Sequence, residues 1–184
     1  QSTTQPLHTV VSPVAQHVYS VKTSGGKKGK ISISRIRVTT ETLVTDLEIN
    51  RAIPSRRADR LAFIAKLLSR GKSSIIYSTG PSDAERNALA LTANNDLPTL
   101  ESEEINEIRN SLSDFIHEEY YLVDCLEKGV GYHFGAMPDI AKVSVENLFK
   151  REKISYIACT STLLEGVNLP AKNIFIDSPK LGKE

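Results

Sequence analysis

The spacing of apolar residues changes near residue 50, and this change divides the chain into two parts. In the first part Ile31 and Ile33 alternate with serines, and a turn of sequence SGGKKGK separates two polar–apolar runs. Alternation with a period of two predicts a β-hairpin over residues 14–38. Residues 1–12 are polar and are predicted to be a linker, whereas the secondary structure of residues 39–50 is ambiguous from the sequence.

From residue 55 onward, helical stretches alternate with short apolar runs. Helices are predicted over residues 56–70, 82–93, 101–117 and 119–128 and after Pro138, and strands over residues 74–78, 130–133, 154–159 and 174–176. Because such alternation builds right-handed crossovers, it predicts an α/β fold with a mostly parallel sheet and helices on both of its faces.

Local signals refine these helices. Ser82 and Glu85 have the spacing of a capping box, which predicts a helix that starts at Ser82. Pro138 suits the first position of the helix that follows it. The apolar positions predicted to face the core are Ile105, Ile108, Leu112, Phe115 and Ile116 in the long helix and Val145, Leu148 and Phe149 in the later one.

Composition narrows the class of protein. The 184 residues suit one ordinary domain with an extension, and 40% hydrophobic and 24% charged residues indicate a folded chain. The net charge of +1 provides no general attraction to nucleic acid, so any such site must be local. Cys125 and Cys159 lie in apolar runs and are predicted to be reduced core residues of an intracellular, cytoplasmic protein. No apolar run approaches the roughly 20 residues of a membrane span, so no membrane association is predicted.

Two stretches look like anion-binding sites. The glycine-rich turn contains Lys27, Lys28 and Lys30, for which a solvated turn is favoured over contact with a nucleic-acid backbone. The tripeptide Gly71-Lys72-Ser73 matches the end of a phosphate-binding P-loop. That pattern requires glycine where this chain has Lys66, and it follows a strand, whereas here a helix precedes and a strand follows. The tripeptide is therefore predicted to be a helix-to-strand turn, with Gly71 ending the helix.

Candidate ligand-binding residues follow the predicted strands, because parallel sheets bind ligands beyond the carboxyl ends of their strands. After the strand that ends at Cys159 come three hydroxyl side chains, Thr160, Ser161 and Thr162. Hydroxyls at the start of a helical turn suit a phosphate oxygen. From the residues alone, a phosphate site and an ordinary helix cap are about equally supported.

Three segments carry a resemblance to a known family. TSTLLEGVNLPA, at residues 160–171, resembles motif V of superfamily 2 (DEAD/DEAH-type) helicases in the form used by the superkiller (Ski)-like branch. GYHFGAMP followed by VENLF, within residues 131–149, resembles a second segment of that branch, and SIIYSTGPSDAE, at residues 74–85, resembles motif IV. The segments occur in the family order and extend the resemblance over about residues 55–178.

The resemblance implies a domain organisation and a set of partners. Residues 51–184 are similar to the second RecA-like domain, a three-layer α/β fold, and residues 1–50 form a linker and β-hairpin extension. The implied ligand is RNA or DNA. The implied cofactors are ATP and Mg²⁺, bound mainly by the first RecA-like domain of the same parent chain.

The resemblance also implies roles for particular residues. Thr160 and Ser161 would contact the nucleic-acid backbone, and Gly166 and Asn168 would face the nucleotide. The loop from His133 to Met137 would line the path of the strand, with contacts at Gly135 and Met137. For His133 itself, a contact role and a structural role that holds the loop are equally supported.

The chain departs from the family pattern at several positions. Phe134 stands where a second histidine is usual, Asp139-Ile140-Ala141-Lys142 where an arginine is common, and Gly80-Pro81 where Ser/Thr-Arg is usual, which weakens the case for contacts from the Gly80 loop. The P-loop lysine and the acidic Asp-Glu motif of the family are absent, and motif VI would follow Leu181. No catalytic residue and no metal ligand are therefore predicted here, and the isolated fragment is expected to be inactive.

The predicted function is one wall of the ATP cleft and part of the strand path of an ATP-dependent helicase or translocase. Two alternatives remain. One is a non-catalytic helicase-like scaffold or nucleic-acid-binding module, and the other is a stand-alone nucleotide-binding α/β domain.

Overall fold

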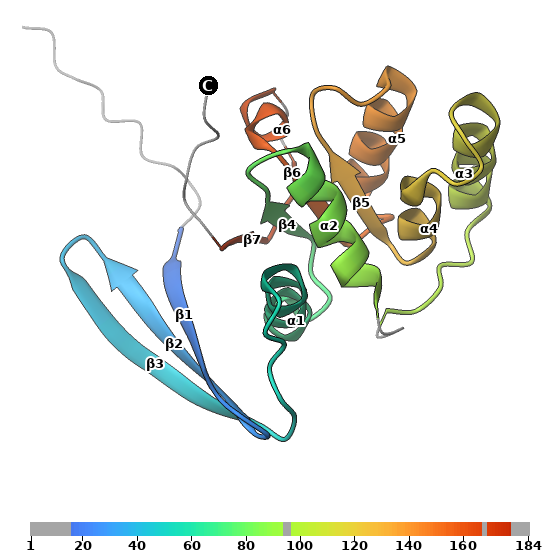
Figure 1. The fold of residues 1–184 in the computed structure, drawn as a ribbon. Helices are drawn as coiled ribbons and strands as arrows, with labels where there is room; N and C mark the ends of the chain where they lie inside the picture. Colours follow the sequence, from blue (N-terminus) through green and yellow to red (C-terminus); the bar gives the residue numbers. More distant parts are fainter. Residues whose placement is uncertain (1–15, 94–96, 167–168, 178–184) are drawn as a thin grey trace, which may run out of the picture. The chain divides into compact units, whose positions relative to one another are not determined.

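The structure, a computed structural model, describes residues 16–93, 97–166 and 169–177. The chain divides into two compact units, Gln1–Ile53 and Pro54–Glu184. Each unit contains its own β-sheet (Figure 1).

The first unit is an antiparallel sheet of three strands in the order β1-β2-β3. These strands are β1 (Val18–Gly25), β2 (Gly29–Arg37) and β3 (Thr40–Ile49). The predicted hairpin is confirmed as the pairing of β1 with β2. Strand β3 was not predicted. A register shift at Ile33/Ser34 leaves Val44 of β3 without a partner on β2. Such a bulge interrupts the period of two by which strands are identified in a sequence.

The turn between β1 and β2 depends on glycine. Gly25 has a φ of +104°, and a Cβ at this position would lie 2.3 Å from the backbone oxygen of Lys28. Lys30 lies 2.8 Å from Asp46 on β3, so one of the three lysines belongs to a charge pair of the sheet itself. Lys30 is thus a residue of β2 and not of the turn, and its ammonium group already has a carboxylate partner.

The second unit confirms the predicted α/β fold. Its four strands are β4 (Ser74–Tyr77), β5 (Val130–His133), β6 (Tyr156–Cys159) and β7 (Asn173–Ile176), all parallel and in the order β5-β6-β4-β7. Its helices are α1 (Arg57–Ser69), α2 (Pro81–Thr92), α3 (Glu103–Phe115), α4 (Tyr121–Glu127), α5 (Asp139–Lys150) and α6 (Ser161–Gly166).

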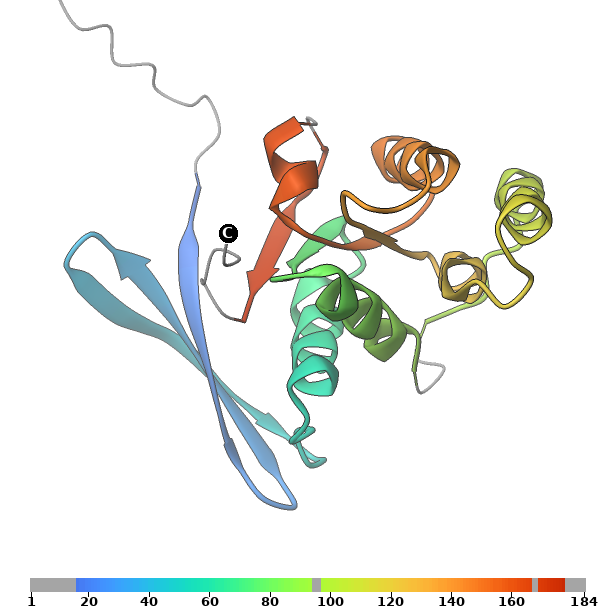
Figure 2. The same ribbon diagram turned by 45° about the horizontal axis from the view of Figure 1, so that its top comes forward.

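The helices cover both faces of the sheet. Figure 2 shows α1 and α2 on one side of the strands and α5 and α6 on the other. The chain reverses its direction across the sheet after β5, and right-handed crossovers then place the following helices on the opposite face. The neighbouring strands β4 and β6 therefore send α2 and α6 to different faces. Their carboxyl ends form the topological switch point at which open α/β sheets bind ligands.

The core lies between the sheet and its helices. All residues of β5 and β6 are buried, as expected for strands covered on both faces. Val145, Leu148 and Phe149 are buried as predicted. In α3 the prediction is wrong for Phe115, whose side chain is 77% exposed. With 3.6 residues per turn, Phe115 is rotated by about 80° from the buried Ile105, beyond the edge of the covered stripe.

Two predicted helix starts are wrong by a small shift. Helix α2 begins at Pro81 after Gly80, so Ser82 lies inside the first turn and forms no side-chain cap. Proline is itself favoured at the first helical position, and here it fixes the start one residue earlier than the capping-box pattern does. Pro138 precedes α5 as its N-cap and is not the first helical residue.

The P-loop-like tripeptide is confirmed as a helix-to-strand turn. Arg70 and Gly71 have φ values of 50° and 73°, which end α1 in the left-handed conformation. The hydroxyl of Ser73 donates a hydrogen bond to the carbonyl oxygen of Pro170 at 2.7 Å. Residues 70–73 thus connect α1 to β4, and the Ser73 hydroxyl is used in a contact within the fold.

Both cysteines lie in the core, as predicted, and are free thiols. Burial raises the pKa of each thiol, Cys125 and Cys159, to about 12, so both are neutral near pH 7. Among the described residues, none of the helices has the length and apolar character required to cross a membrane.

Candidate nucleic-acid interface

The loops that follow β5, β6 and β4 begin side by side at one edge of the sheet. The N–H of Thr160 donates to the carbonyl oxygen of His133 at 3.2 Å, and the N–H of Ser78 donates to that of Cys159 at 2.8 Å. These bonds continue the parallel ladder beyond the ends of the strands. They fix the relative positions of three loops that are far apart in the sequence.

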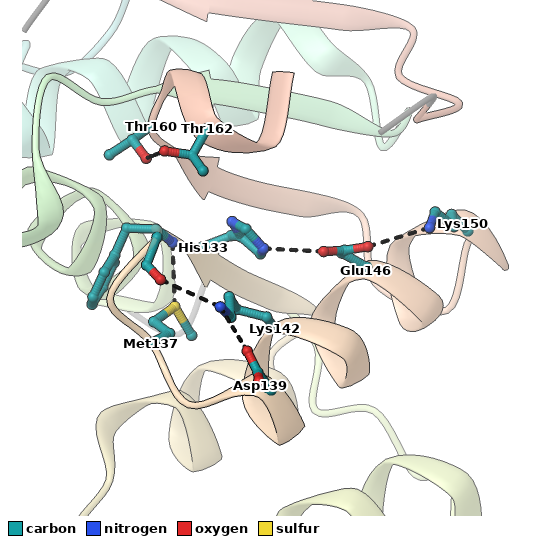
Figure 3. A network of polar contacts seen from close by, with 10 residues as sticks. His133, Met137, Asp139, Lys142, Glu146, Lys150, Thr160 and Thr162 are labelled. Atoms are coloured by element: carbon teal, nitrogen blue, oxygen red, sulfur yellow. Dashed lines mark hydrogen bonds and ion pairs between the residues drawn. The ribbon is translucent and has the colours of Figure 1, made fainter. Parts of the chain in front are cut away.

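The hydroxyl side chains after β6 are accessible at this edge. Thr160 and Ser161 are half-buried and Thr162 is exposed, at the point where the predicted helical turn forms as α6. The hydroxyl of Thr160 donates to that of Thr162 at 3.5 Å, near the limit for a hydrogen bond (Figure 3). No other hydrogen bond of the Thr160 side chain is present among the described residues, so the hydroxyl can turn toward a ligand.

The loop after β5 lies against these hydroxyls. A Cβ built on Gly135 would be 3.7 Å from both the Oγ1 and the Cγ2 atoms of Thr162. Two segments of the family resemblance that are separate in the sequence therefore meet at one place. Thr162 is not one of the residues that the sequence predicts to bind nucleic acid, although its hydroxyl follows directly after those of Thr160 and Ser161.

Met137 has a structural position in the loop. Its side chain is 4% exposed, and its sulfur accepts a hydrogen bond from the N–H of Phe134 at 3.3 Å. Its own N–H donates to the carbonyl oxygen of Phe134 at 3.2 Å. The thioether therefore fills the inside of the turn, and the predicted contact of Met137 with the strand stays a prediction. Gly135, which is exposed, retains its predicted role as a proposal.

His133 is the last residue of β5 and is 3% exposed. Its Nε2 atom lies 3.2 Å from Oε1 of Glu146, whose other oxygen accepts from Lys150 at 3.3 Å (Figure 3). A neutral ring that donates from Nε2 to the carboxylate keeps its lone pair on Nδ1, which has no partner among the described residues. Of the two sequence-based interpretations, this geometry favours the structural histidine.

The protonation of His133 should appear in the pH dependence of stability. Burial lowers the pKa of His133 below its ordinary value of 6.5, and the hydrogen bond to Glu146 opposes this shift only in part. As the pH falls below 6.5, the unfolded chain therefore binds a proton that the folded chain does not. The free energy of unfolding should decrease in this range, by at most about 1.4 kcal/mol per pH unit.

Urea unfolding followed by circular dichroism at 222 nm between pH 5 and 7 measures this slope. The matched variant His133→Gln can still donate to Glu146 but does not titrate, so it should have a shallower slope. Equal slopes in the two proteins would show that His133 is not the group responsible. Carboxylates that do not contact His133 contribute to both proteins alike.

The loop after β4 is occupied by contacts within the fold. Asn87 donates to the hydroxyl of Ser78 at 3.0 Å, Thr79 donates to Asp83, and Arg86 donates to the same carboxylate at 2.8 Å. The polar side chains at this end of β4 therefore bind to residues of α2. The departure from the family pattern at Gly80-Pro81 lies in this same loop.

The two residues predicted to face a nucleotide are only partly covered by the structure. Gly166 is the last residue of α6, and Asn168 lies outside the described residues. In the described part of the chain, no three or more His, Cys, Asp or Glu side chains are grouped so that they could hold a metal ion.

Comparison with known proteins relates the chain to helicases, although no protein-family profile matches it. It is 30% identical over 169 residues to the ATP-dependent DNA helicase MER3 homolog of Oryza sativa subsp. japonica, which covers 86% of this chain and 14% of that protein. It is 31% identical over 111 residues to the ATP-dependent DNA helicase Hel308 of Pyrococcus horikoshii, covering 59% of this chain and 15% of that protein. It is 26% identical over 113 residues to the exosome RNA helicase MTR4 of Mus musculus, covering 58% of this chain and 11% of that protein.

The chain therefore spans about a seventh or less of the length of these relatives. The α/β fold and the sequence similarity to helicases agree with one another. The chain is thus homologous to helicases, both DNA and RNA helicases by name, over more than half of its own length.

Proposed function

We propose that residues 51–184 are the second RecA-like domain of an ATP-dependent helicase or translocase of the Ski-like branch, and that the edge formed by the ends of β5 and β6 contacts the backbone of RNA or DNA. The observation that carries this proposal is the meeting of Gly135 with the hydroxyl run that starts at Thr160. Exposed hydroxyls and a glycine loop suit phosphate and sugar contacts, which hold a strand without reading its bases.

In the longer protein, ATP and Mg²⁺ would be held mainly by the first RecA-like domain, and Gly166 and Asn168 would face the nucleotide across the cleft. The bound nucleotide would supply the free energy that closes the two domains. Closure would move the edge that holds the strand, and hydrolysis would release it. The described residues hold the strand and provide no group for the phosphoryl-transfer step itself.

Titration of the chain with single-stranded RNA and DNA of mixed sequence, at about 50 and 200 mM salt, tests this proposal. We expect binding that tolerates changes of sequence and weakens steeply with salt, because phosphate contacts release counterions. ATP alone should bind very weakly or not at all. Tight binding of ATP with no binding of either strand would instead support a stand-alone nucleotide-binding domain.

A non-catalytic nucleic-acid-binding module is the second candidate, favoured by the departures at Phe134 and Gly80-Pro81. It shares strand binding with the motor, so binding does not separate the two. Hydrolysis of ATP by the longer protein, with and without single-stranded nucleic acid, does separate them. Stimulated turnover supports the motor, and strand binding without turnover supports the module.

A further inference from the structure

Lys142, in the first turns of α5, reaches back to the loop that precedes its own helix (Figure 3). Its ammonium group donates to the carbonyl oxygen of Gly135 at 3.3 Å and lies 2.8 Å from Oδ1 of Asp139. The Lys142 side chain is only 24% exposed. The loop is therefore attached to α5 at one specific peptide group.

This contact determines the direction of the next amide. In a trans peptide the carbonyl and the N–H point in opposite directions, and no described peptide bond is cis. Because the Gly135 carbonyl is directed toward Lys142, the N–H of Ala136 is directed away from α5. Gly135 and Ala136 are exposed, and within the described part of the chain neither amide donates a hydrogen bond.

The glycine at 135 is not required by the fold itself. Its φ lies outside the left-handed range, and a Cβ there would make only ordinary van der Waals contacts, at 3.7 Å from Thr162. A backbone that must approach a ligand closely also favours glycine. The amides of Gly135 and Ala136 and the missing side chain at Gly135 thus suit the same ligand, a hydrogen-bond acceptor that comes close to the main chain.

We propose that Lys142 is a positioning residue that orients the Gly135–Ala136 peptide so that the Ala136 N–H donates to a phosphate oxygen of the bound strand. This inference rests on the proposed function. The ammonium of Lys142 already has a carboxylate and a carbonyl as acceptors, so its contribution is to fix the loop. The phosphate contact belongs to the main-chain amide.

The variant Lys142→Met tests the proposal through two independent readouts. The first is the ¹H–¹⁵N resonance of Ala136 in the free chain, which should shift and broaden when the carbonyl loses its donor. The second is the affinity for a single-stranded oligonucleotide, which should fall about tenfold, the usual effect of losing one hydrogen bond to a charged group. The slope of log affinity against log salt should stay unchanged, because the number of cationic phosphate contacts does not change. Lys142→Arg, which can also donate to the carbonyl, should restore both.

Lys153→Met is the matched control. It removes the same charge just beyond the carboxyl end of the same helix, where Lys153 faces Glu104 and not the loop, and should leave the Ala136 resonance unchanged.

The possible outcomes are distinct. An unchanged Ala136 resonance in Lys142→Met overturns the inference whatever the affinity does. A salt slope reduced by about one unit shows direct contact of Lys142 with phosphate, and also overturns it. Equal affinities of the wild type and Lys142→Met reject the positioning role but leave the proposed function intact. A wild-type chain that binds no strand at any salt rejects the proposed function, and this inference with it.

Discussion

Replacing Phe149 with alanine is expected to lower the free energy of unfolding of the unit Pro54–Glu184 by about 3–5 kcal/mol. The Phe149 side chain is completely buried in the last part of α5, among the residues of β5, β6 and the neighbouring helices. Truncation removes the transfer free energy of the ring and leaves a cavity that the surrounding residues fill only in part. A domain of this size has a total stability of roughly 5–15 kcal/mol, so the loss is a large share of it.

Urea unfolding followed by circular dichroism at 222 nm measures this change, because the helices of the described residues all lie in this unit. Val143→Ala is the matched control, since Val143 belongs to the same helix and is 55% exposed. Its effect should stay within about 0.5 kcal/mol. A loss below about 1 kcal/mol for Phe149→Ala would show that α5 is not anchored in the core as described.

Replacing Thr160 with alanine is expected to reduce the affinity for single-stranded RNA or DNA by about tenfold, without a matching loss of stability. A hydrogen bond to a charged phosphate contributes about 1.5–3 kcal/mol, and alanine cannot make it. Among the described residues, the Thr160 hydroxyl has only a long contact with Thr162, so folding loses little. The proposed function requires that Thr160→Ala lowers the affinity for nucleic acid while the stability of the fold stays nearly unchanged.

Fluorescence anisotropy with a labelled oligonucleotide gives the affinity, and urea unfolding gives the stability. Thr92→Ala provides the control, because Thr92 is the last residue of α2 and its hydroxyl donates to the carbonyl oxygen of Leu89. It should bind nucleic acid as the wild type does. If Thr160→Ala binds normally, or loses affinity only in proportion to its stability, the edge at β6 is not a strand contact.

Helix α5 connects these expectations. One of its faces supplies Phe149 to the core, while Glu146 holds His133 and Lys142 holds the loop at Gly135. The interface thus rests on a helix that is itself fixed by burial. Loss of core packing should therefore also loosen the loop, whereas loss of the Lys142 contact should loosen the loop alone.

The sequence by itself determined the class of fold and most of its elements. Helical periodicity and short apolar runs are local properties, and they located the four strands of the second unit and the helix end at Gly71. The burial of Cys125 and Cys159 followed from their apolar surroundings. The hydroxyl run at Thr160 was also visible in the sequence, and its role stays a prediction.

Only the tertiary structure decided which side chains are available at the edge of the sheet. Met137 and His133 face inward because Phe134 and Glu146, on other parts of the loop and helix, provide their partners. The place of Thr162 beside Gly135 depends on the pairing of β5 with β6. The conformation of the loop sets the contact within it, and the packing of separate elements sets the others; a local pattern of apolar and polar residues records neither.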